Sequence, residues 1–271
     1  MEVQKETIHY FLIALALLIG LLFGSFYTAL SDRILYYFYG KGRKLPSKWD
    51  LIFFKPSFCM NCGRDINRIH LIPVLGFFLT GGKCSFCRTP IGAHRLLGEI
   101  YPGILLASLV ALNENWAFSF LTVLFVGHLY ISISTDWNFF MLDYENSIFL
   151  YIFGIPAVIF KHGIGETALF HLYTAVFVFF ILFILFAAGK GRKFGMGDLI
   201  MAPALAFYLG PLLSIILFQL AASMSIIYIL FIQKDRKAPS PFGTFMGISL
   251  FIIIAADIGM ELLNAEVFKI N

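Results

Sequence analysis

The chain has 271 residues, 59% of them apolar and 13% charged, with a mean hydropathy of +0.84 and a formal net charge of +4. Soluble globular domains are roughly half apolar and about a quarter charged, so this composition excludes a soluble domain. It predicts an all-α protein that crosses a membrane several times.

Eight apolar segments predict about eight transmembrane helices, because a span needs about 20 apolar residues, or fewer where a helix is sheltered. They lie near residues 9–30, 96–113, 117–135, 146–160, 167–188, 199–215, 217–233 and 243–263. The boundary between the sixth and seventh falls inside one long apolar stretch, after Gly210-Pro211. The first segment follows Glu2, Lys5 and Glu6 rather than a basic region, so we interpret it as a retained helix and not a removed signal peptide.

The lysines and arginines predict the orientation of these spans. Of the 20, eleven lie between Leu30 and Leu96, three lie near residue 190 and three near residue 234. If eight spans alternate, those 17 share one side of the membrane, which the positive-inside rule makes cytoplasmic. We therefore expect both termini on the non-cytoplasmic side, with Lys5, Lys161 and Lys269.

All the cysteines lie in the basic loop between the first two spans. They form two C-x-x-C pairs, Cys59 with Cys62 and Cys84 with Cys87. Four thiolates with this spacing are typical of a zinc ribbon, and disulfides are disfavoured in a reducing cytoplasmic loop. We expect Gly63 and Gly81-Gly82 to supply the tight turns that aim both sulfurs of a pair at one ion. Because four thiolates fill the coordination sphere, we assign zinc to folding and not to chemistry.

The predicted parts are therefore a first transmembrane helix at 1–30, a cytoplasmic zinc-binding domain at 31–95 and a transmembrane domain at 96–271. A compact loop without zinc is the alternative, since the apolar segment 71–75 can pack under the cysteine pairs.

Two aspartates stand at the predicted cytoplasmic ends of spans. Asp136 ends the third, and Asp198 closes Gly195-Met196-Gly197-Asp198 just before a helix expected to begin at Leu199. Each can be a helix cap or a solvated carboxylate. Facing each other near a low-dielectric boundary, the two cannot both ionise cheaply, so one holds a proton while the other is charged. Such a pair can activate a water molecule to attack a peptide carbonyl without a metal. Because two coupled carboxyl groups titrate as a unit, the sequence does not assign the acid and the base between them.

The glycines beside Asp198 have a place in this hypothesis. Without side chains, Gly195 and Gly197 would let a substrate backbone approach the carboxylate and would permit unusual backbone angles. A lone G-x-G-D, however, has little specificity.

The chain resembles the type IV prepilin peptidases, membrane aspartic proteases of the GxGD class, over nearly its whole length. The matching residues are Gly24-Ser25-Phe26, Arg33, Ile72-Pro73, Gly82-Lys83-Cys84, the four cysteines, Glu99, Asp136, Gly195 to Asp198 and Pro241-Phe242-Gly243. The resemblance implies that Asp136 and Asp198 are catalytic.

Several positions depart from the family pattern. An ungapped match puts Asp143-Tyr144 where the family usually has Pro-Asp or Pro-Asn, which makes Asp143 a rival for the first catalytic position. Ile200 replaces a usual Lys, and Thr28 stands where an Asn is usual. Glu99 either lies near the path of a basic leader peptide or pairs with Arg95 at i, i+4 spacing.

The resemblance implies cleavage of the N-terminal leader of prepilin or pseudopilin substrates at the cytoplasmic face of a bacterial inner membrane. It also implies N-methylation of the new amine with S-adenosylmethionine, which the change at Thr28 leaves open. No motif indicates nucleic-acid binding, and neither the oligomeric state nor the system served follows from the sequence. Two alternatives remain: a non-enzymatic scaffold or ion transporter with a zinc-stabilised partner-binding loop, and a protease for another membrane-anchored protein.

Overall fold

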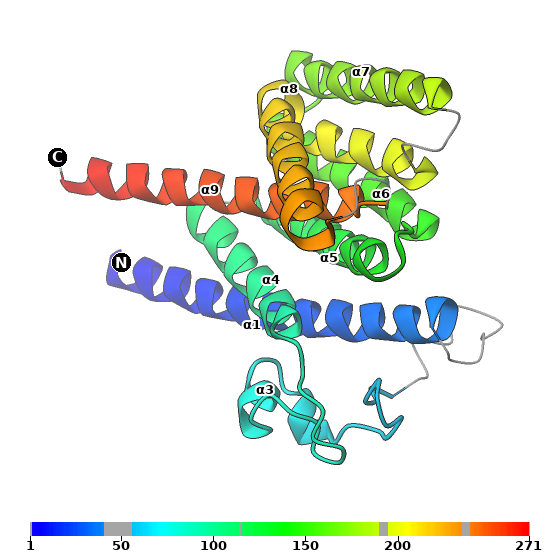
Figure 1. The fold of residues 1–271 in the computed structure, drawn as a ribbon. Coiled ribbons are helices and arrows are strands. Elements are labelled where there is room, and N and C mark those ends of the chain that lie inside the picture. The colour runs from blue at the N-terminus through cyan, green and yellow to red at the C-terminus, as the bar shows by residue number, and fades with distance from the viewer. Residues whose placement is uncertain (1, 41–55, 114, 190–194, 235–238, 271) are drawn as a thin grey trace. The chain divides into compact units, whose positions relative to one another are not determined.

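The structure is a computed structural model that describes residues 2–40, 56–113, 115–189, 195–234 and 239–270. Across these ranges the chain is helical apart from loops and two isolated β-bridges, which confirms the all-α class (Figure 1). The chain divides into two compact units, residues 1–111 and 112–271. The predicted division at 30 and 95 stays a prediction. Basic residues at 41–55, 190–194 and 235–238, on which the orientation partly depends, lie outside the described ranges.

The first unit consists of two long helices and the cysteine-containing segment between them. Its elements are α1 (Glu2–Ile34), the π-helix η1 (Leu35–Tyr39), the 3-10 helix η2 (Arg68–Leu71), α3 (Leu75–Leu79) and α4 (Ala93–Leu112), whose last residue lies past the boundary. Helices α1 and α4 approach closely at two glycines one turn apart. A Cβ atom on Gly20 would lie 2.3 Å from the Pro102 carbonyl oxygen, and one on Gly24 would lie 2.6 Å from that of Glu99. Small residues at this spacing let membrane helices pack backbone to backbone.

The second unit is a bundle of helices. It contains α5 (Trp116–Phe139), α6 (Tyr144–His162), α7 (Glu166–Ala188), α8 (Met196–Ile227), the π-helix η3 (Tyr228–Gln233) and α9 (Phe242–Ile270). Helix α8 packs against α6, α7 and α9, while α5 packs against α6 and α9. Fully buried side chains such as Phe125, Leu129, Met201 and Leu250 fill the space between them. The bundle brings the end of α5 to the beginning of α9, and both take part in the site described below.

Helix α8 bends at Gly210, and its two halves run in clearly different directions (Figure 1). Gly210 has φ 76° and ψ −176°, a conformation open to glycine, and Pro211 cannot donate a helical hydrogen bond. The bend also lies against the ring of His171, which a Cβ atom on Gly210 would approach to 2.9 Å. The predicted boundary between the sixth and seventh spans, between residues 215 and 217, lies one to two helical turns after this bend.

Six helices within the described ranges are long and apolar enough to cross a membrane, which supports a multi-pass membrane protein. They cover Glu6–Tyr39, Ala93–Leu112, Trp116–Phe139, Glu166–Ala188, Met196–Gln233 and Phe242–Asn264. The expected number of about eight differs in two places. Segments 199–215 and 217–233 belong to one bent element, and α6 is helical but too polar at its ends, where Glu145 and Lys161 leave a short apolar centre.

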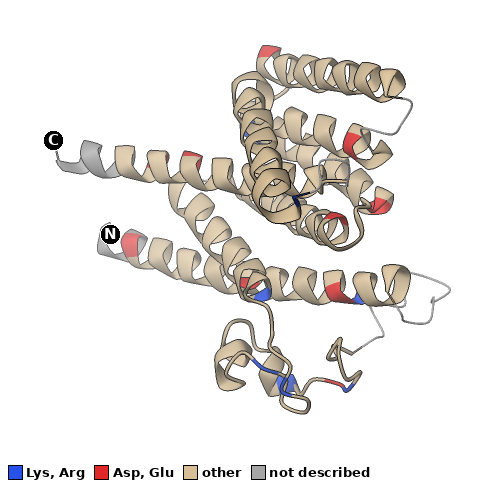
Figure 2. Cartoon of the chain, viewed as in Figure 1, with Lys and Arg blue, Asp and Glu red and all other residues tan. Residues whose placement is uncertain are grey.

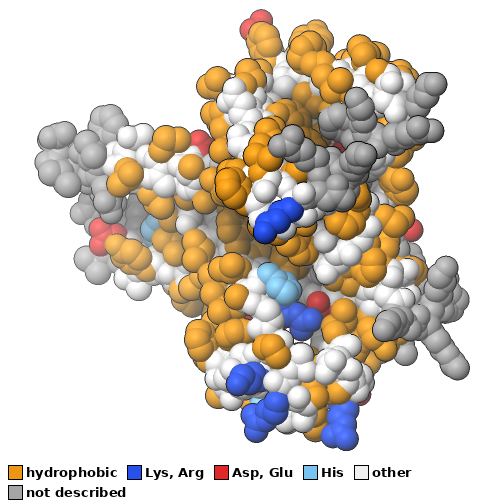
Figure 3. Space-filling view, viewed as in Figure 1, with side chains coloured by type: hydrophobic (Ala, Val, Ile, Leu, Met, Phe, Trp, Pro, Cys, Tyr) orange, Lys and Arg blue, Asp and Glu red, His pale blue; other side chains and the backbone are white. Residues whose placement is uncertain are grey.

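The surface of the helices fits a lipid environment. Charged residues are few along the helices (Figure 2), and hydrophobic side chains cover much of the visible face (Figure 3). Large apolar side chains such as Phe177, Leu212 and Phe231 are exposed. In water such a surface would drive aggregation, whereas hydrocarbon solvates it without cost.

Candidate active site and candidate metal centre

The four cysteine sulfurs gather at one point of the first unit. Each Sγ atom lies within 4.8 Å of the other three, and the Cys59 and Cys87 sulfurs are 3.7 Å apart. Zinc–sulfur bonds of about 2.3 Å in a tetrahedron separate the sulfurs by about 3.8 Å, so the cluster fits a zinc ion. The predicted ligands Cys59, Cys62, Cys84 and Cys87 are thus brought together.

Each cysteine pair sits in the same kind of tight turn. The Gly63 N–H donates to the Cys59 carbonyl at 2.8 Å, and the Arg88 N–H donates to the Cys84 carbonyl at 3.0 Å. Both donors have positive φ, 71° for Gly63 and 59° for Arg88. Gly81-Gly82 also have positive φ, so all the predicted glycines serve turns, but the second pair relies additionally on a strained arginine.

Hydrogen bonds stabilise a thiolate on one side of the cluster. The Thr89 hydroxyl and N–H and the Asn61 side chain lower the pKa of the Cys87 thiol to about 5. Burial raises the pKa of the Cys59 thiol to about 11, so that sulfur gains most from a neighbouring cation. Outer hydrogen bonds of this kind are typical of metal-binding thiolates.

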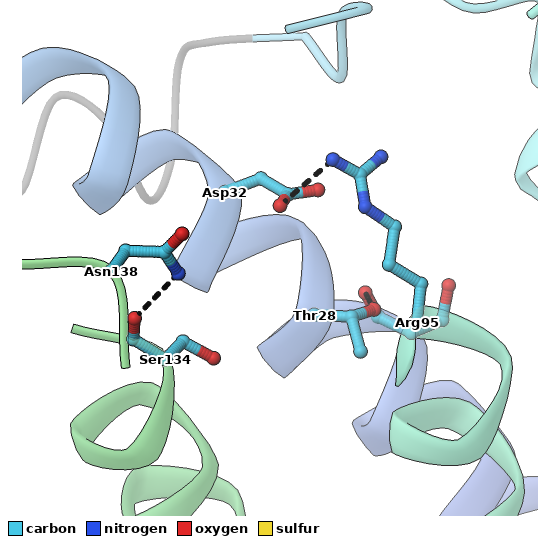
Figure 4. A network of polar contacts seen from close by, with 6 residues as sticks. Thr28, Asp32, Arg95, Ser134 and Asn138 are labelled. Atoms are coloured by element: carbon cyan, nitrogen blue, oxygen red, sulfur yellow. Dashed lines mark hydrogen bonds and ion pairs between the residues drawn. The ribbon is translucent and has the colours of Figure 1, made fainter. Parts of the chain in front are cut away.

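Glu99 ties the cysteine-containing segment to the long helices of the first unit. Its Oε1 atom accepts a hydrogen bond from the Ser25 hydroxyl at 3.2 Å, and its Oε2 atom accepts one from the Val74 N–H at 2.7 Å. Arg95 forms its ion pair with Asp32 of α1, at 3.0 Å (Figure 4). The carboxylate of Glu99 therefore has a clear structural role, which sequence spacing alone did not indicate.

A cavity of about 330 Å³ opens beside this network, between α1, the cysteine-containing segment and the start of α4. It is lined by charged groups and by aromatic rings, including Asp32, Arg33, Arg95, Glu99, Phe26 and Phe77. The Arg95 Nε atom is buried and has no hydrogen-bond partner within the described part of the chain. Thr28, which stands at the position of the usual Asn, also lines the cavity, and its hydroxyl donates to the Ser25 carbonyl at 2.9 Å. The cavity is large enough for a small-molecule ligand.

Asp136 lies inside the last turn of α5. The sequence had placed it just after the third span, which was expected to end at residue 135. The helix continues to Phe139, and the Asn138 side chain donates to the Ser134 carbonyl at 2.8 Å (Figure 4). Asp136 is 6% exposed. Its Oδ2 atom accepts two hydrogen bonds from Thr244 at the start of α9, from the N–H at 2.6 Å and from the hydroxyl at 3.0 Å.

Asp198 lies in the first turn of α8. The prediction that it caps a helix beginning at Leu199 is wrong by three residues, because the helix begins at Met196 with Gly195 as its N-cap. The Asp198 Oδ2 atom instead accepts a hydrogen bond from the Gly195 N–H at 3.3 Å, as the third residue of a capping box does. Asp136 and Asp198 lie in one region of the second unit, near enough for the charge of one to act on the other. Both border Leu142, since Cβ atoms on Gly243, next to Asp136 Oδ2, and on Gly197 would each lie within 3.1 Å of it.

The rival position, Asp143, has a structural role. It is buried and is the N-cap of α6, where its Oδ1 atom accepts a hydrogen bond from the Glu145 N–H at 3.1 Å. An N-cap carboxylate satisfies a helix donor that would otherwise be unpaired.

The two glycines of the Gly-Met-Gly-Asp segment differ. Neither has positive φ, so the expectation of unusual backbone angles is wrong. Gly197 is buried in α8, and a Cβ atom there would lie 2.5 Å from the Leu142 Cβ. Gly195 is exposed, and a Cβ atom there would lie in ordinary contact, 3.5 Å from the Asp198 Oδ2 atom. Gly197 thus permits close packing, while a side chain at Gly195 would stand directly beside the Asp198 carboxylate.

Sequence reasoning missed Thr244. A tertiary contact between residues 108 positions apart leaves no local pattern. The available signal was its place directly after Pro241-Phe242-Gly243, at the polar start of an apolar helix, where Ser and Thr often cap.

Comparisons with known proteins support the family resemblance. Residues 18–113 match the family described as Bacterial Peptidase A24 N-terminal domain. A protein named prepilin leader peptidase/N-methyltransferase from Dichelobacter nodosus is 29% identical over 80% of this chain and 77% of its own length. One of the same name from Legionella pneumophila is 26% identical, over 78% and 76%.

A relative from Escherichia coli, named type 4 prepilin-like proteins leader peptide-processing enzyme, is 27% identical over 83% of this chain and 86% of its own length. No solved structure matches the chain. These matches confirm the resemblance and the expectation of an enzyme.

The sulfur cluster predicts about one zinc ion per chain. Metal analysis of freshly purified protein should find it, and Cys59→Ser should remove it, because three thiolates bind zinc much more weakly than four. A Ser85→Ala variant, changed within the second pair but outside the ligand set, should keep its zinc. Purified protein without bound metal would contradict the assignment.

The glycine contacts predict opposite outcomes for two neighbouring substitutions. Gly197→Ala should destabilise the protein by about 1–3 kcal/mol, because the new methyl group overpacks against Leu142. Gly195→Ala should leave thermal unfolding in detergent unchanged. Gly197→Ala should cost less in a Leu142→Gly background than in the wild type, because the nearest atom, the Leu142 Cβ, is then absent. Equal destabilisation by both glycine variants would contradict the contact.

Proposed function

We propose that this chain, a relative of the type IV prepilin peptidases, is a membrane aspartic endopeptidase that removes the N-terminal leader of prepilin or pseudopilin substrates. The observation that carries the proposal is the pairing of Asp136 and Asp198, which come from the end of α5 and the start of α8. The names of the relatives supply the substrate class.

The proposed chemistry is general acid–base hydrolysis by two carboxyl groups. The ionised member takes a proton from a water molecule as its oxygen attacks the scissile carbonyl carbon, and the protonated member gives its proton to the carbonyl oxygen. Gly195 is exposed beside Asp198 and places no side chain between the carboxylate and an extended substrate backbone.

We propose that the reaction takes place at the cytoplasmic face of a bacterial inner membrane. The proposal is supported by the charge distribution, since 17 of the 20 lysines and arginines fall in loops that share one side under the eight-span topology. In that topology both termini lie on the non-cytoplasmic side, and the lipid bilayer surrounds the helices.

Zinc has a structural role in this proposal. Cys59, Cys62, Cys84 and Cys87 would complete its coordination sphere, which leaves no open position for substrate. The metal would instead hold the cysteine-containing segment in shape against the cavity that Cys59 and Cys84 help to line.

We also propose that the cavity of the first unit binds S-adenosylmethionine, which supplies a methyl group to the new N-terminal amine. Its lining suits such a ligand, because Asp32 and Glu99 offer carboxylates to ammonium and sulfonium charges. Arg95, whose buried Nε–H has no partner among the described residues, offers a donor to a carboxylate. Phe26 and Phe77 offer apolar surface to an adenine ring.

The aspartic mechanism predicts that Asp136→Asn and Asp198→Asn each lower leader cleavage by at least about 100-fold, the usual contribution of a catalytic acid or base. Mass spectrometry of a prepilin incubated with the purified enzyme in detergent reports the cleaved product and any added methyl group. Both masses should disappear together, because methylation needs the newly formed amine.

Asp143→Asn is the matched control for these variants. Asn is as good an N-cap as Asp, so α6 should keep its start and cleavage should continue. Retained cleavage in Asp136→Asn would show that Asp136 is not catalytic. Loss of cleavage in Asp143→Asn would instead favour Asp143 as the catalytic residue.

The cavity predicts a variant that separates the two activities. Ala29→Trp fills the cavity from α1 without removing a polar group, so S-adenosylhomocysteine binding, measured by calorimetry, and methylation should be lost while leader cleavage continues. Leu18→Trp, at a residue of α1 that is 59% exposed, should change neither. Unaltered binding in Ala29→Trp would place the ligand elsewhere.

A further inference from the structure

We propose that Thr244 is a positioning residue that keeps Asp136 as the ionised member of the aspartate pair, which makes Asp136 the general base and Asp198 the general acid. This assignment rests on the proposed function, and it adds a residue and a division of roles that neither the sequence nor the comparisons give.

The first support is the concentration of donors on one oxygen atom. The N–H and the hydroxyl of Thr244 both point to Asp136 Oδ2, at 2.6 and 3.0 Å. Thr244 is 1% exposed, so water does not replace these contacts. Hydrogen bonds donated to a carboxylate favour its charged form, and buried ones do so most strongly.

The two donors differ in their freedom. The Thr244 N–H belongs to the first turn of α9, where a backbone donor has no partner within the helix, so the carboxylate satisfies it. The hydroxyl has one proton and two acceptors within reach, Asp136 Oδ2 at 3.0 Å and the Ile133 carbonyl oxygen at 3.2 Å. A charged acceptor attracts that proton more strongly than a carbonyl does, so both donors serve Asp136 when it is ionised.

Among the residues that the structure describes, which exclude 190–194, Asp198 has no comparable arrangement. Within them its carboxylate accepts one hydrogen bond, from the Gly195 N–H at 3.3 Å. The dipole of α8 favours negative charge at Asp198, in its first turn. Asp136 lies in the last turn of α5 but faces the first turn of α9, so the dipoles of these two helices oppose each other there. We therefore base the division of roles on the hydrogen bonds. The two carboxyl groups differ in how many hydrogen bonds they accept and in how short these bonds are. This difference leaves the shared proton on Asp198.

The residue before Thr244 makes this contact possible. A Cβ atom on Gly243 would lie 3.1 Å from Asp136 Oδ2 and 3.1 Å from Leu142, so a larger residue would push α9 away from the carboxylate. Gly243 and Thr244 thus act together, one by leaving space and the other by donating.

The assigned roles give a balanced hydrolysis. Asp136 takes a proton from water, the water oxygen bonds to the scissile carbon, and Asp198 gives its proton to the carbonyl oxygen, forming a neutral diol. Asp136 then passes its proton to the amide nitrogen while Asp198 takes one from the diol. The carbon–nitrogen bond breaks, the acid and amine leave, and both aspartates regain their first states.

Steady-state cleavage of a prepilin peptide by Thr244 variants tests the proposal. Thr244→Ser keeps both donors and should cleave at close to the wild-type rate. Thr244→Val keeps the shape and the N–H but loses the hydroxyl, and kcat should fall about tenfold with KM unchanged, since a hydrogen bond to a charged group contributes about that factor. Thr244→Pro loses both donors in a helix turn that tolerates proline, and kcat should fall about 100-fold.

Thr122→Val is the matched control. Thr122 is also buried on the bundle side of α5 and loses one hydrogen bond, to the Tyr208 hydroxyl, about 21 Å along the helix from Asp136. Its kcat should match the wild type. Equal kcat in the wild type and Thr244→Val would overturn the proposal. Equal losses of kcat in Thr244→Ser and Thr244→Val would overturn it as well. The comparison of these two variants is sufficient even if Thr244→Pro does not fold.

The division of roles has its own readout. An Asn side chain can donate a hydrogen bond to a carbonyl oxygen but cannot take a proton from water, so residual cleavage should be higher in Asp198→Asn than in Asp136→Asn. The reverse order would overturn the roles. A wild-type enzyme that leaves prepilin uncut would instead refute the proposed peptidase function itself.

Discussion

A carboxylate held away from water must find hydrogen-bond donors in the protein, and the second unit is arranged around that requirement. Asp136 is buried in the last turn of α5, and the donors it needs come from the unsatisfied first turn of α9. The contact also satisfies α9, whose N–H group would otherwise be unpaired. One interaction therefore satisfies both a helix start and a buried carboxyl group, and it joins the end of α5 to the beginning of α9.

The first unit follows the same rule with different chemistry. Glu99 accepts a hydrogen bond from Val74, a residue held at φ 64° at the start of α3, and another from Ser25 of α1. The carboxylate thereby joins a short irregular segment to two long helices. In the cysteine cluster, donors near Cys87 serve a thiolate in place of a carboxylate. In both units a carboxyl group accepts hydrogen bonds from a backbone N–H and a hydroxyl group: Glu99 from Val74 and Ser25, and Asp136 from Thr244.

Much of this could be predicted from the sequence, since composition and apolar runs depend on local information. The helices, the cysteine cluster and the pair Asp136 and Asp198 followed from runs, spacing and resemblance. What failed depends on tertiary contacts: Gly197 is needed for Leu142 and not for its backbone angles, and Thr244 reaches Asp136 across more than 100 residues. Arg88 shows the same limit, because nothing local predicts an arginine at positive φ where the first turn has Gly63.

The bend at Gly210 has a consequence for the membrane itself. The part of α8 between Met196 and the bend is 14 residues long, or about 21 Å, which is shorter than the roughly 30 Å hydrocarbon core of a bilayer. A segment this short does not cross the whole core before the bend, so thinner lipid or water beside the helix would bring Asp198 closer to the aqueous phase. The thickness of the surrounding lipid is therefore one of the conditions that determine how much water reaches Asp136 and Asp198.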